Sequence, residues 1–351
     1  MSLREKKVLV LGMGETGLSM TKWLSGRGAK VTVADSRAIP PSIEAVKRIL
    51  PEVHVFTGAY PAEAFAGIDL IAISPGVPVA LPVVQHAVQG GIPVVGDMEL
   101  FASAIRQPGN PRPTVLAITG SNGKTTVTAM VGAMVKEAGL DVEVAGNIGP
   151  AVLDALMRRE DSGKLPQAWV LEVSSFQLET TRSLEPDAAA VLNVSEDHFD
   201  RYSGMQDYAA AKARIFMSEH VAGKDGGGIQ ILNRDDPVVR AMTLAERKQM
   251  TFGLDQPASD NDFGLLQEGG SIWLAQGCVR LMRTSELRVA GLHNLANALA
   301  ALALCRAAAL PLPALLRALR EFRGLPHRME KVATLNGITF YDDSKGTNVG
   351  A

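Results

Sequence analysis

The chain has 351 residues, enough for two or three domains that each bury a core of their own. Hydrophobic residues make up 46% of the sequence and charged residues 21%, which excludes a disordered, collagen-like or heavily charged chain. With 35 lysines and arginines against 37 acidic residues, the net charge is −2. No overall positive field attracts nucleic acid or anionic lipid, so any anionic ligand must be bound locally.

Cysteine usage and hydropathy favour a cytoplasmic protein. Cys278 and Cys305 are too few for a disulfide framework and are not spaced as metal ligands, which fits a reducing compartment. The apolar run behind the charged start covers only residues 8–11, too short for a signal peptide. The most apolar stretch, residues 295–316, is interrupted by Asn297 and other breakers, so it is not expected to span a bilayer.

The first part of the chain predicts a Rossmann-like α/β domain over residues 1–108. Apolar runs separated by a helix-length stretch predict its strands, at residues 8–11, 30–34, 71–74 and 94–95. Residues 106–113 carry three prolines and a glycine, which disfavour helix and strand. We therefore place the first domain boundary there.

A glycine pattern follows the first strand of this domain. Residues 12–17 match the dinucleotide fingerprint, and Asp35 ends the next strand at the expected distance. Its glycines let the backbone approach a phosphate, while the helix N-terminus supplies partial positive charge. The pattern does not distinguish NAD from another nucleotide diphosphate, and a tight turn without a ligand remains an alternative.

A second α/β domain is predicted over residues 113–323. Continuous apolar runs predict a parallel sheet covered on both faces, with strands at residues 114–118, 168–173, 189–194 and 228–232. Residues 271–290 predict an antiparallel addition, and residues 295–309 an alanine-rich helix. After a second boundary at 325–329, one strand at 338–341 predicts the start of a third α/β domain over residues 324–351.

The first strand of the second domain runs into a candidate phosphate-binding loop at residues 118–126. Gly120 and Gly123 shape the loop, Lys124 can reach the β- and γ-phosphates, and the Thr125 hydroxyl can bind magnesium. The loop departs from the strict P-loop pattern, because Ile118 stands where that pattern has its first glycine.

Further polar groups follow the later strands. Glu172 ends a strand at the edge where open α/β sheets bind ligands, so it could hold a metal or be an ordinary strand-end acid. His198, in a polar segment after the next strand, could be a ligand, a base or a structural histidine. Lys212 lies on a predicted helix and by itself indicates a solvated surface lysine. Asn294 and Asn297 could contact a base or cap a helix.

Four segments together resemble the Mur ligase family. Residues 119–126 are similar to a loop general to that family, whereas residues 174–179, 196–202 and 324–328 resemble its D-glutamate-adding branch in particular. The similarity covers essentially the whole chain.

The resemblance implies an ATP-dependent amide ligase of peptidoglycan precursor synthesis. It would add D-glutamate to UDP-N-acetylmuramoyl-L-alanine through an acyl phosphate, with ATP and Mg²⁺, in the cytoplasm and as a monomer. The implied partners are these small substrates, not nucleic acid or a membrane. In this interpretation the first domain binds UDP-linked substrate rather than NAD.

The resemblance also implies site residues. The catalytic residues would be Lys124, Glu172, His198 and Lys212. The UDP-substrate residues would be Glu15, Thr16, Asp35, Ser36, Arg37, Ser74, Gly76 and Asn147. The ATP residues would be Gly120, Ser121, Asn122, Gly123, Lys124, Thr125, Thr126, Asn294, Asn297, Arg328 and Asp343. The acceptor site would contain His327, Lys345 and Thr347, and the metal ligands would be Thr125, Glu172, His198 and a carbamylated Lys212.

The family's third domain continues beyond the equivalent of residue 351. We therefore expect a fragment or incomplete gene product that binds UDP-linked substrate but ligates poorly.

Several alternative functions remain open. An NAD-dependent oxidoreductase explains residues 12–17 but not the loop at 120–126, and a non-catalytic P-loop switch has no use for the first site. Another Mur ligase is possible, and folylpolyglutamate synthase, a relative of that family, lacks the UDP-binding first domain.

Overall fold

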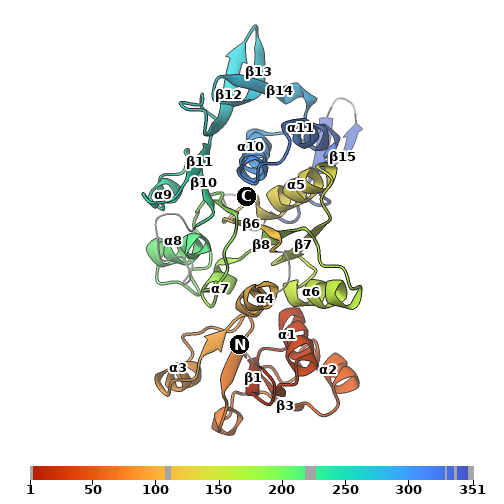
Figure 1. Ribbon diagram of the computed structural model, residues 1–351, viewed down its shortest axis with the longest axis vertical. Helices are drawn as coiled ribbons and strands as arrows, with labels where there is room; N and C mark the ends of the chain where they lie inside the picture. The colour runs from red at the N-terminus through yellow and green to blue at the C-terminus, as the bar shows by residue number, and fades with distance from the viewer. Residues whose placement is uncertain (1–2, 107–111, 218–226, 329, 336–337, 347–351) are drawn as a thin grey trace.

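The computed structural model describes residues 3–106, 112–217, 227–328, 330–335 and 338–346. Its elements stack along one long axis, with the first sheet at one end and the strands β12 to β14 at the other (Figure 1). The predicted first boundary falls largely on residues 107–111, outside the described residues, and Met329 of the second boundary lies outside them as well.

The first sheet is parallel, with strand order β3-β2-β1-β4-β5. Its strands are β1 (Lys7–Leu11), β2 (Lys30–Asp35), β3 (His54–Thr57), β4 (Leu70–Ile73) and β5 (Val94–Val95). The helices of this part are α1 (Glu15–Gly26), α2 (Ile43–Ile49) and α3 (Pro82–Gln89), with a short 3₁₀ turn, η1 (Ala62–Phe65). The strand order reverses between β1 and β4, so their carboxyl ends form the crevice where such sheets bind ligands.

The four strands predicted for this part are confirmed. Val8 to Leu11 are fully buried, as expected for a parallel strand that helices cover on both faces. β3 was not predicted because it is a four-residue edge strand, exposed at both ends, without a continuous apolar run.

The second sheet has nine strands in the order β14-β13-β12-β11-β10-β9-β6-β8-β7. The strands from β7 to β12 in this order are parallel, and β12, β13 and β14 form an antiparallel meander. The bounds are β6 (Thr114–Thr119), β7 (Val142–Gly146), β8 (Ala168–Glu172), β9 (Ala188–Val191), β10 (Ile229–Asn233), β11 (Gln249–Phe252), β12 (Asp262–Glu268), β13 (Ser271–Gln276) and β14 (Val279–Arg283). The predicted strands and antiparallel addition are confirmed, whereas β7, β11 and β12 were missed.

Helices cover both faces of the second sheet. Leu116 and Ile118 of β6 belong to the hydrophobic core shared with α5 (Lys124–Glu137), α10 (Leu292–Ala307) and α11 (Leu312–Glu321). Val115 and Ala117, on the opposite face, pack into the core shared with α4 (Asp97–Ile105) and α6 (Val152–Asp161). The remaining short helices are α7 (Ser175–Leu178), α8 (Met205–Ala213), η2 (Arg214–Phe216), α9 (Pro237–Arg240) and η3 (Thr284–Glu286).

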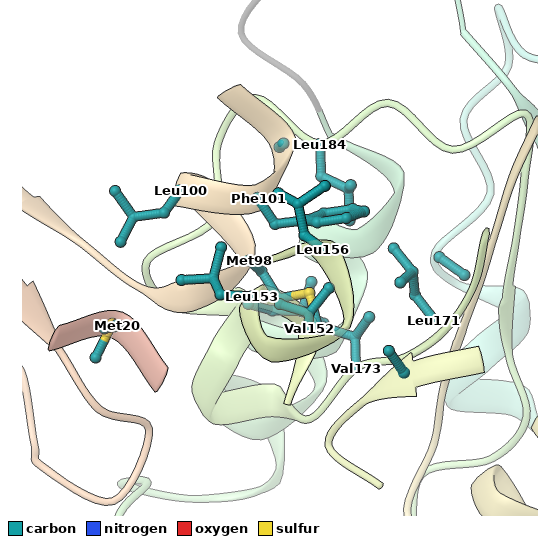
Figure 2. Close-up of a cluster of buried hydrophobic side chains, with 14 of the residues drawn as sticks. Met20, Met98, Leu100, Phe101, Val152, Leu153, Leu156, Leu171, Val173 and Leu184 are labelled. Atoms are coloured by element: carbon teal, nitrogen blue, oxygen red, sulfur yellow. The ribbon is translucent and has the colours of Figure 1, made fainter. Parts of the chain in front are cut away.

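The α4–α6 core also joins the two sheets. Figure 2 shows side chains of α4 and α6 packed together, with Leu171 of β8 and Val173 just after that strand on one side and Met20 of α1 on the other. The first sheet therefore rests on helices that are part of the second sheet's core. Residues of both sheets therefore belong to one continuous hydrophobic core.

After residue 324, the expectation of a single strand is incomplete. β15 (Glu330–Leu335) pairs antiparallel with β16 (Ile338–Asp342) to form a two-stranded sheet. The first of these strands was missed because its sequence lacks a continuous apolar run. In the part of the chain that the structure describes, no helix is both long and apolar enough to cross a membrane. The apolar segment after residue 295 instead lies in α10 and α11, inside the core.

Asp97, the first residue of α4, is buried at the junction of the two sheets. Its Oδ2 accepts a hydrogen bond from Gln177 Nε2 at 2.8 Å, and burial raises the pKa of Asp97 to about 6. Since the folded-state pKa lies above the ordinary value, folding is favoured by protonation of Asp97 at low pH. That contribution is lost as pH rises through about 6.

We therefore expect Asp97→Asn to remove one component of the pH dependence of stability. Between pH 4 and pH 7, the unfolding free energy of the parent protein should fall relative to that of the variant by up to about 3 kcal/mol. Urea denaturation of both proteins across this range measures the difference. Two parallel stability curves would contradict the assigned pKa.

Candidate active site

The loop between β6 and α5 has the geometry of a phosphate-binding loop. Gly120 and Gly123 both have positive φ angles, 158° and 79°. The φ angle of Gly123 favours glycine, and a Cβ atom there would lie 2.6 Å from Oδ1 of Asn297, so the Asn297 amide would have to move. The loop delivers the chain to the N-terminus of α5, where free N–H groups and the helix dipole favour an anion.

Two lysines converge on this loop. Lys124 Nζ donates to the carbonyl oxygens of Gly120 and Ser121, at 2.8 and 2.9 Å. Lys212 Nζ donates to the same Gly120 oxygen at 2.9 Å and lies 4.3 Å from the ring centroid of Tyr208. Lys212 is only 1% exposed, so the alternative of a solvated surface lysine is wrong.

The surroundings of both lysines disfavour positive charge. Burial, followed by the charge of Lys124, lowers the pKa of Lys212 well below its ordinary value, although Asp197 acts in the opposite direction. Burial also lowers the pKa of Lys124, against the attraction of Glu172 and Asp197. The larger lowering at Lys212 favours its neutral amine, the form of lysine that reacts as a nucleophile.

Glu172 lies at the carboxyl end of β8, next to the phosphate-binding loop. Its side chain is buried, and Oε1 accepts a hydrogen bond from Asn147 Nδ2 at 2.8 Å. Oε2 has no hydrogen-bond partner within the described residues. A buried carboxylate oxygen without a partner is costly unless a cation or donor satisfies it.

His198 follows β9 and is held by an aromatic cluster. Its ring centroid lies 4.7 Å from that of Phe176 and 5.9 Å from that of Tyr208, and its φ angle of 56° is in the left-handed region. The hydroxyl of Ser121 donates to Tyr208 Oη at 3.2 Å. The cluster thus connects the His198 turn to the phosphate-binding loop.

Side chains around the loop offer a few oxygen atoms to a magnesium ion. Among the described residues, no three His, Cys, Asp or Glu side chains lie together as a ready metal site. Magnesium prefers oxygen ligands, and Glu172 Oε2 with the Thr125 hydroxyl supplies only two. The residues therefore fit magnesium if Lys212 contributes carboxylate oxygens as a carbamate.

A cavity of about 520 Å³ opens beside the loop. Seven predicted ATP residues line it: Asn122, Gly123, Thr126, Asn294, Asn297, Arg328 and Asp343. Gly120, Ser121, Lys124 and Thr125 complete the loop at its edge, where Arg328 Nη2 donates to Thr125 Oγ1 at 3.2 Å. Sequence reasoning missed other lining residues that belong to no motif: Asn233, Phe252, Arg288, His293, Arg323 and Tyr341.

The predicted acceptor residues are not gathered at this cavity. His327 is exposed and its Nδ1 lies 2.6 Å from Asp342 Oδ2, while Lys345 is exposed and joined to His327 by a backbone hydrogen bond. Neither side chain lines the cavity. Thr347 lies outside the described residues.

A second cavity, of about 690 Å³, lies at the switch point of the first sheet. All eight predicted UDP-substrate residues line it: Glu15, Thr16, Asp35, Ser36, Arg37, Ser74, Gly76 and Asn147. Sequence reasoning missed Tyr60, Leu81 and Gln177, which line it as well. Asn147 therefore lines this cavity while its amide contacts Glu172 beside the other one.

Asp35 is fully engaged inside the second cavity. One oxygen accepts from the Met13 backbone N–H at 2.7 Å and from Arg37 Nη2 at 2.6 Å, and the other accepts from the Arg37 backbone and Nε. Burial acts to raise the pKa of Asp35, but these hydrogen bonds, led by that of the Arg37 side chain, hold it below its ordinary value. The carboxylate thus fixes Arg37 and the glycine turn, and in this arrangement does not offer a free oxygen to a ribose hydroxyl.

The glycines of the first turn differ sharply in the space around them. A Cβ atom on Gly17 would lie 1.8 Å from the Gly12 carbonyl oxygen, whereas one on Gly14 would have no heavy atom within 4 Å. We expect Gly17→Ala to lower the unfolding free energy by about 3 kcal/mol or more, because backbone must move. Gly14→Ala, the matched control, should stay close to the parent in urea denaturation. Equal effects would contradict the close approach.

Fold and site together define a nucleotide-binding α/β protein with two separate ligand cavities, and comparison with known proteins agrees. The sequence matches the Mur ligase MurD-like N-terminal domain over residues 6–96 and the Mur ligase middle domain over residues 118–305. The chain belongs to the Mur ligase family.

Two relatives carry the name UDP-N-acetylmuramoylalanine--D-glutamate ligase. The one from Nitrosospira multiformis is 68% identical over 351 residues, covering all of this chain and 73% of the relative. The one from Nitrosomonas europaea is 64% identical, covering all of this chain and 74% of the relative.

Solved structures share the fold at low identity. A UDP-N-acetylmuramate-alanine ligase from Thermotoga maritima has a TM-score of 0.56 at 20% identity, covering 96% of this chain and 74% of that one. A UDP-N-acetylmuramate:L-alanyl-gamma-D-glutamyl-meso-diaminopimelate ligase from Neisseria meningitides has a TM-score of 0.58 at 16% identity, covering 92% and 99%. The mixed α/β architecture predicted from the sequence is confirmed.

Proposed function

We propose that this chain is an ATP-dependent ligase of peptidoglycan precursor synthesis that joins D-glutamate to UDP-N-acetylmuramoyl-L-alanine. The observation that carries the proposal is a pair of cavities in one chain of this family. One lies on the switch point of the first sheet and the other beside the phosphate-binding loop, with the Asn147–Glu172 hydrogen bond between them. Relatives with 68% and 64% identity bear the name of this activity.

The proposed reaction has two steps. A carboxylate oxygen of the L-alanyl group attacks the γ-phosphorus of ATP, the bond to ADP breaks, and an acyl phosphate forms. The amine of D-glutamate then attacks the acyl carbon, phosphate leaves, and the nitrogen gives up a proton to complete the amide. Lys124 is placed at the loop to offset the phosphate charge that gathers in the first step.

Magnesium and a modified lysine belong to the same proposal. Thr125, Glu172, His198 and a carbamylated Lys212 would hold the ion, which offsets negative charge on the phosphates. Carbamylation joins CO₂ to the neutral amine with loss of a proton, and the lowered pKa of buried Lys212 favours that neutral form. The carbamate also places a negative charge beside Lys124, which favours the charged form of that lysine.

We also propose roles for the residues around the two cavities. The eight residues around the second cavity would bind the UDP-linked substrate, and the loop with Asn294, Asn297, Arg328 and Asp343 would bind ATP. His327, Lys345 and Thr347 would serve the acceptor amino acid. We propose domains at residues 1–108, 113–323 and 324–351, a cytoplasmic location and a monomeric state, which sedimentation of the purified protein would test.

The proposed function is tested by phosphate release from ATP, using the longest form of the chain that its gene encodes. Release should require both UDP-N-acetylmuramoyl-L-alanine and D-glutamate, with L-glutamate, L-alanine and D-alanine as matched acceptors. Release that any of these supports equally, or that needs no UDP-linked substrate, would contradict the proposal. The match covers 73% of the Nitrosospira multiformis relative. The same assay tests the expectation that the 351-residue form ligates poorly.

A further inference from the structure

Arg201 is a largely buried arginine in the turn that carries His198. Its backbone N–H donates to the His198 carbonyl oxygen at 2.9 Å, and its side chain is only 10% exposed. Its guanidinium donates to both carboxylate oxygens of Glu179, from Nε at 3.2 Å and from Nη2 at 2.7 Å. Since Glu179 follows α7, this bidentate pair joins the His198 turn to the segment that begins at Glu172.

The same guanidinium reaches across to the first sheet. Nη1 donates to the Pro75 carbonyl oxygen and Nη2 to that of Val77, both at 3.3 Å. Pro75 and Val77 belong to the segment after β4, which lines the cavity at the switch point. The guanidinium also lies 4.8 Å from the ring centroid of Phe176, whose ring contacts that of His198.

One side chain therefore connects a wall of the first-sheet cavity with the His198 turn near the phosphate-binding loop. Under the proposed function, on which this inference rests, the substrate must lie across both cavities, with its UDP in the first-sheet cavity and its carboxylate at the phosphate-binding loop. The separation of the two walls then decides whether the carboxylate meets the γ-phosphate. Misplacement by about 1 Å can cost about 100-fold in rate.

We propose that Arg201 is a positioning residue that sets this separation and thereby aligns the UDP-linked substrate with ATP. Its planar fork is needed because one group must satisfy two carboxylate oxygens and two carbonyl oxygens at once. A lysine would retain the attraction to Glu179, but a compact ammonium with three donors has no geometry that serves all four acceptors. Arg201 is not among the residues that line the first-sheet cavity, so its role is alignment rather than direct contact with the nucleotide.

Arg27 offers a matched control. It donates from Nη2 to both oxygens of Glu160 at 2.7 and 2.9 Å, and it lies 4.2 Å from the Trp23 ring centroid. It thus joins the end of α1 to α6 through an ion pair and an aromatic contact, but it lines neither cavity. Loss of Arg27 removes an ion pair between the two parts of the chain, which Arg201 joins instead through the Pro75 and Val77 carbonyl oxygens.

The test compares Arg201→Lys, Arg201→Ala and Arg27→Ala with the parent protein. Calorimetry gives the Kd for UDP and for UDP-N-acetylmuramoyl-L-alanine, and the phosphate assay gives kcat. We expect Kd for UDP to change less than about 2-fold in every variant. In the Arg201 variants, kcat should fall about 10- to 100-fold and Kd for the full substrate should rise about 10-fold. Arg27→Ala should keep parental values in both assays.

Hydrogen exchange without ligand separates this inference from the proposed function. The amides of residues 76–77 should exchange faster in Arg201→Lys than in the parent, and at the parental rate in Arg27→Ala. Parental exchange and parental kcat in the Arg201 variants would overturn the positioning role, as would an equal loss of UDP and full-substrate binding. Failure of the proposed function would instead appear in the parent protein itself, as phosphate release independent of the UDP-linked substrate.

Discussion

Lys124→Ala should lower ATP-dependent phosphate release about 1,000-fold while leaving the affinity for UDP-N-acetylmuramoyl-L-alanine within about 2-fold of the parent. The reason is geometric. Lys124 Nζ lies at the phosphate-binding loop, where it donates to Gly120 and Ser121 oxygens, and its side chain does not line the first-sheet cavity. Removing it deletes positive charge only where phosphate charge gathers.

Two measurements separate these effects. Calorimetric titration gives the affinity for the UDP-linked substrate, and the phosphate assay gives turnover. Lys136→Ala is the matched control, because Lys136 lies exposed in the last turn of the same helix, α5. Equal losses of substrate affinity and turnover in Lys124→Ala would contradict the division of labour between the cavities.

The second large effect is expected at Lys212. Lys212→Ala should lower phosphate release at least about 100-fold, and short-chain carboxylates such as formate or acetate should restore part of it. The side chain is buried 2.9 Å from the Gly120 oxygen, and its pKa is lowered first by burial and then by Lys124. A small carboxylate placed in the space left by the side chain would replace the oxygens of the carbamate.

The controls for this rescue are two other variants at the same loop. Lys124→Ala loses a cation at the same loop oxygen, so added carboxylate should not help it. Lys212→Arg keeps a positive charge that cannot carry a carbamate, and it should remain inactive with or without carboxylate. Rescue that is absent in Lys212→Ala, or equal in all three variants, would show that no carbamate acts there.

The strands that the sequence predicted are those with unbroken apolar runs, such as β1, β4, β6 and β8. Short or polar strands escaped prediction. β7 contains Glu143, whose carboxylate is buried. Arg159 Nε of α6 donates a hydrogen bond to it at 2.6 Å, which stabilises the buried charge. The local sequence of β7 does not indicate this partner, because Arg159 lies 16 residues further along the chain.

The first-sheet cavity was predicted more completely than the cavity beside the phosphate-binding loop. Its residues follow directly after strand ends, and in a parallel sheet those ends meet at one edge, so spacing alone brings them together. The burial of Lys212 could not be predicted, because the alanines of α8 leave no distinct apolar face in its sequence. The contacts of Arg201 are equally hidden, since they join three separate segments of the chain.

The central claim is that one polypeptide holds a UDP-linked substrate and ATP at once, in two separate cavities. Equilibrium titration of UDP-N-acetylmuramoyl-L-alanine into the protein with and without saturating ATP and Mg²⁺ tests it most directly. We predict one binding site for the UDP-linked substrate in both cases, with no displacement by ATP and no binding of NADH at that site. Competition between ATP and the UDP-linked substrate for a single site, or occupation of the first-sheet cavity by NADH in preference to UDP, would contradict it.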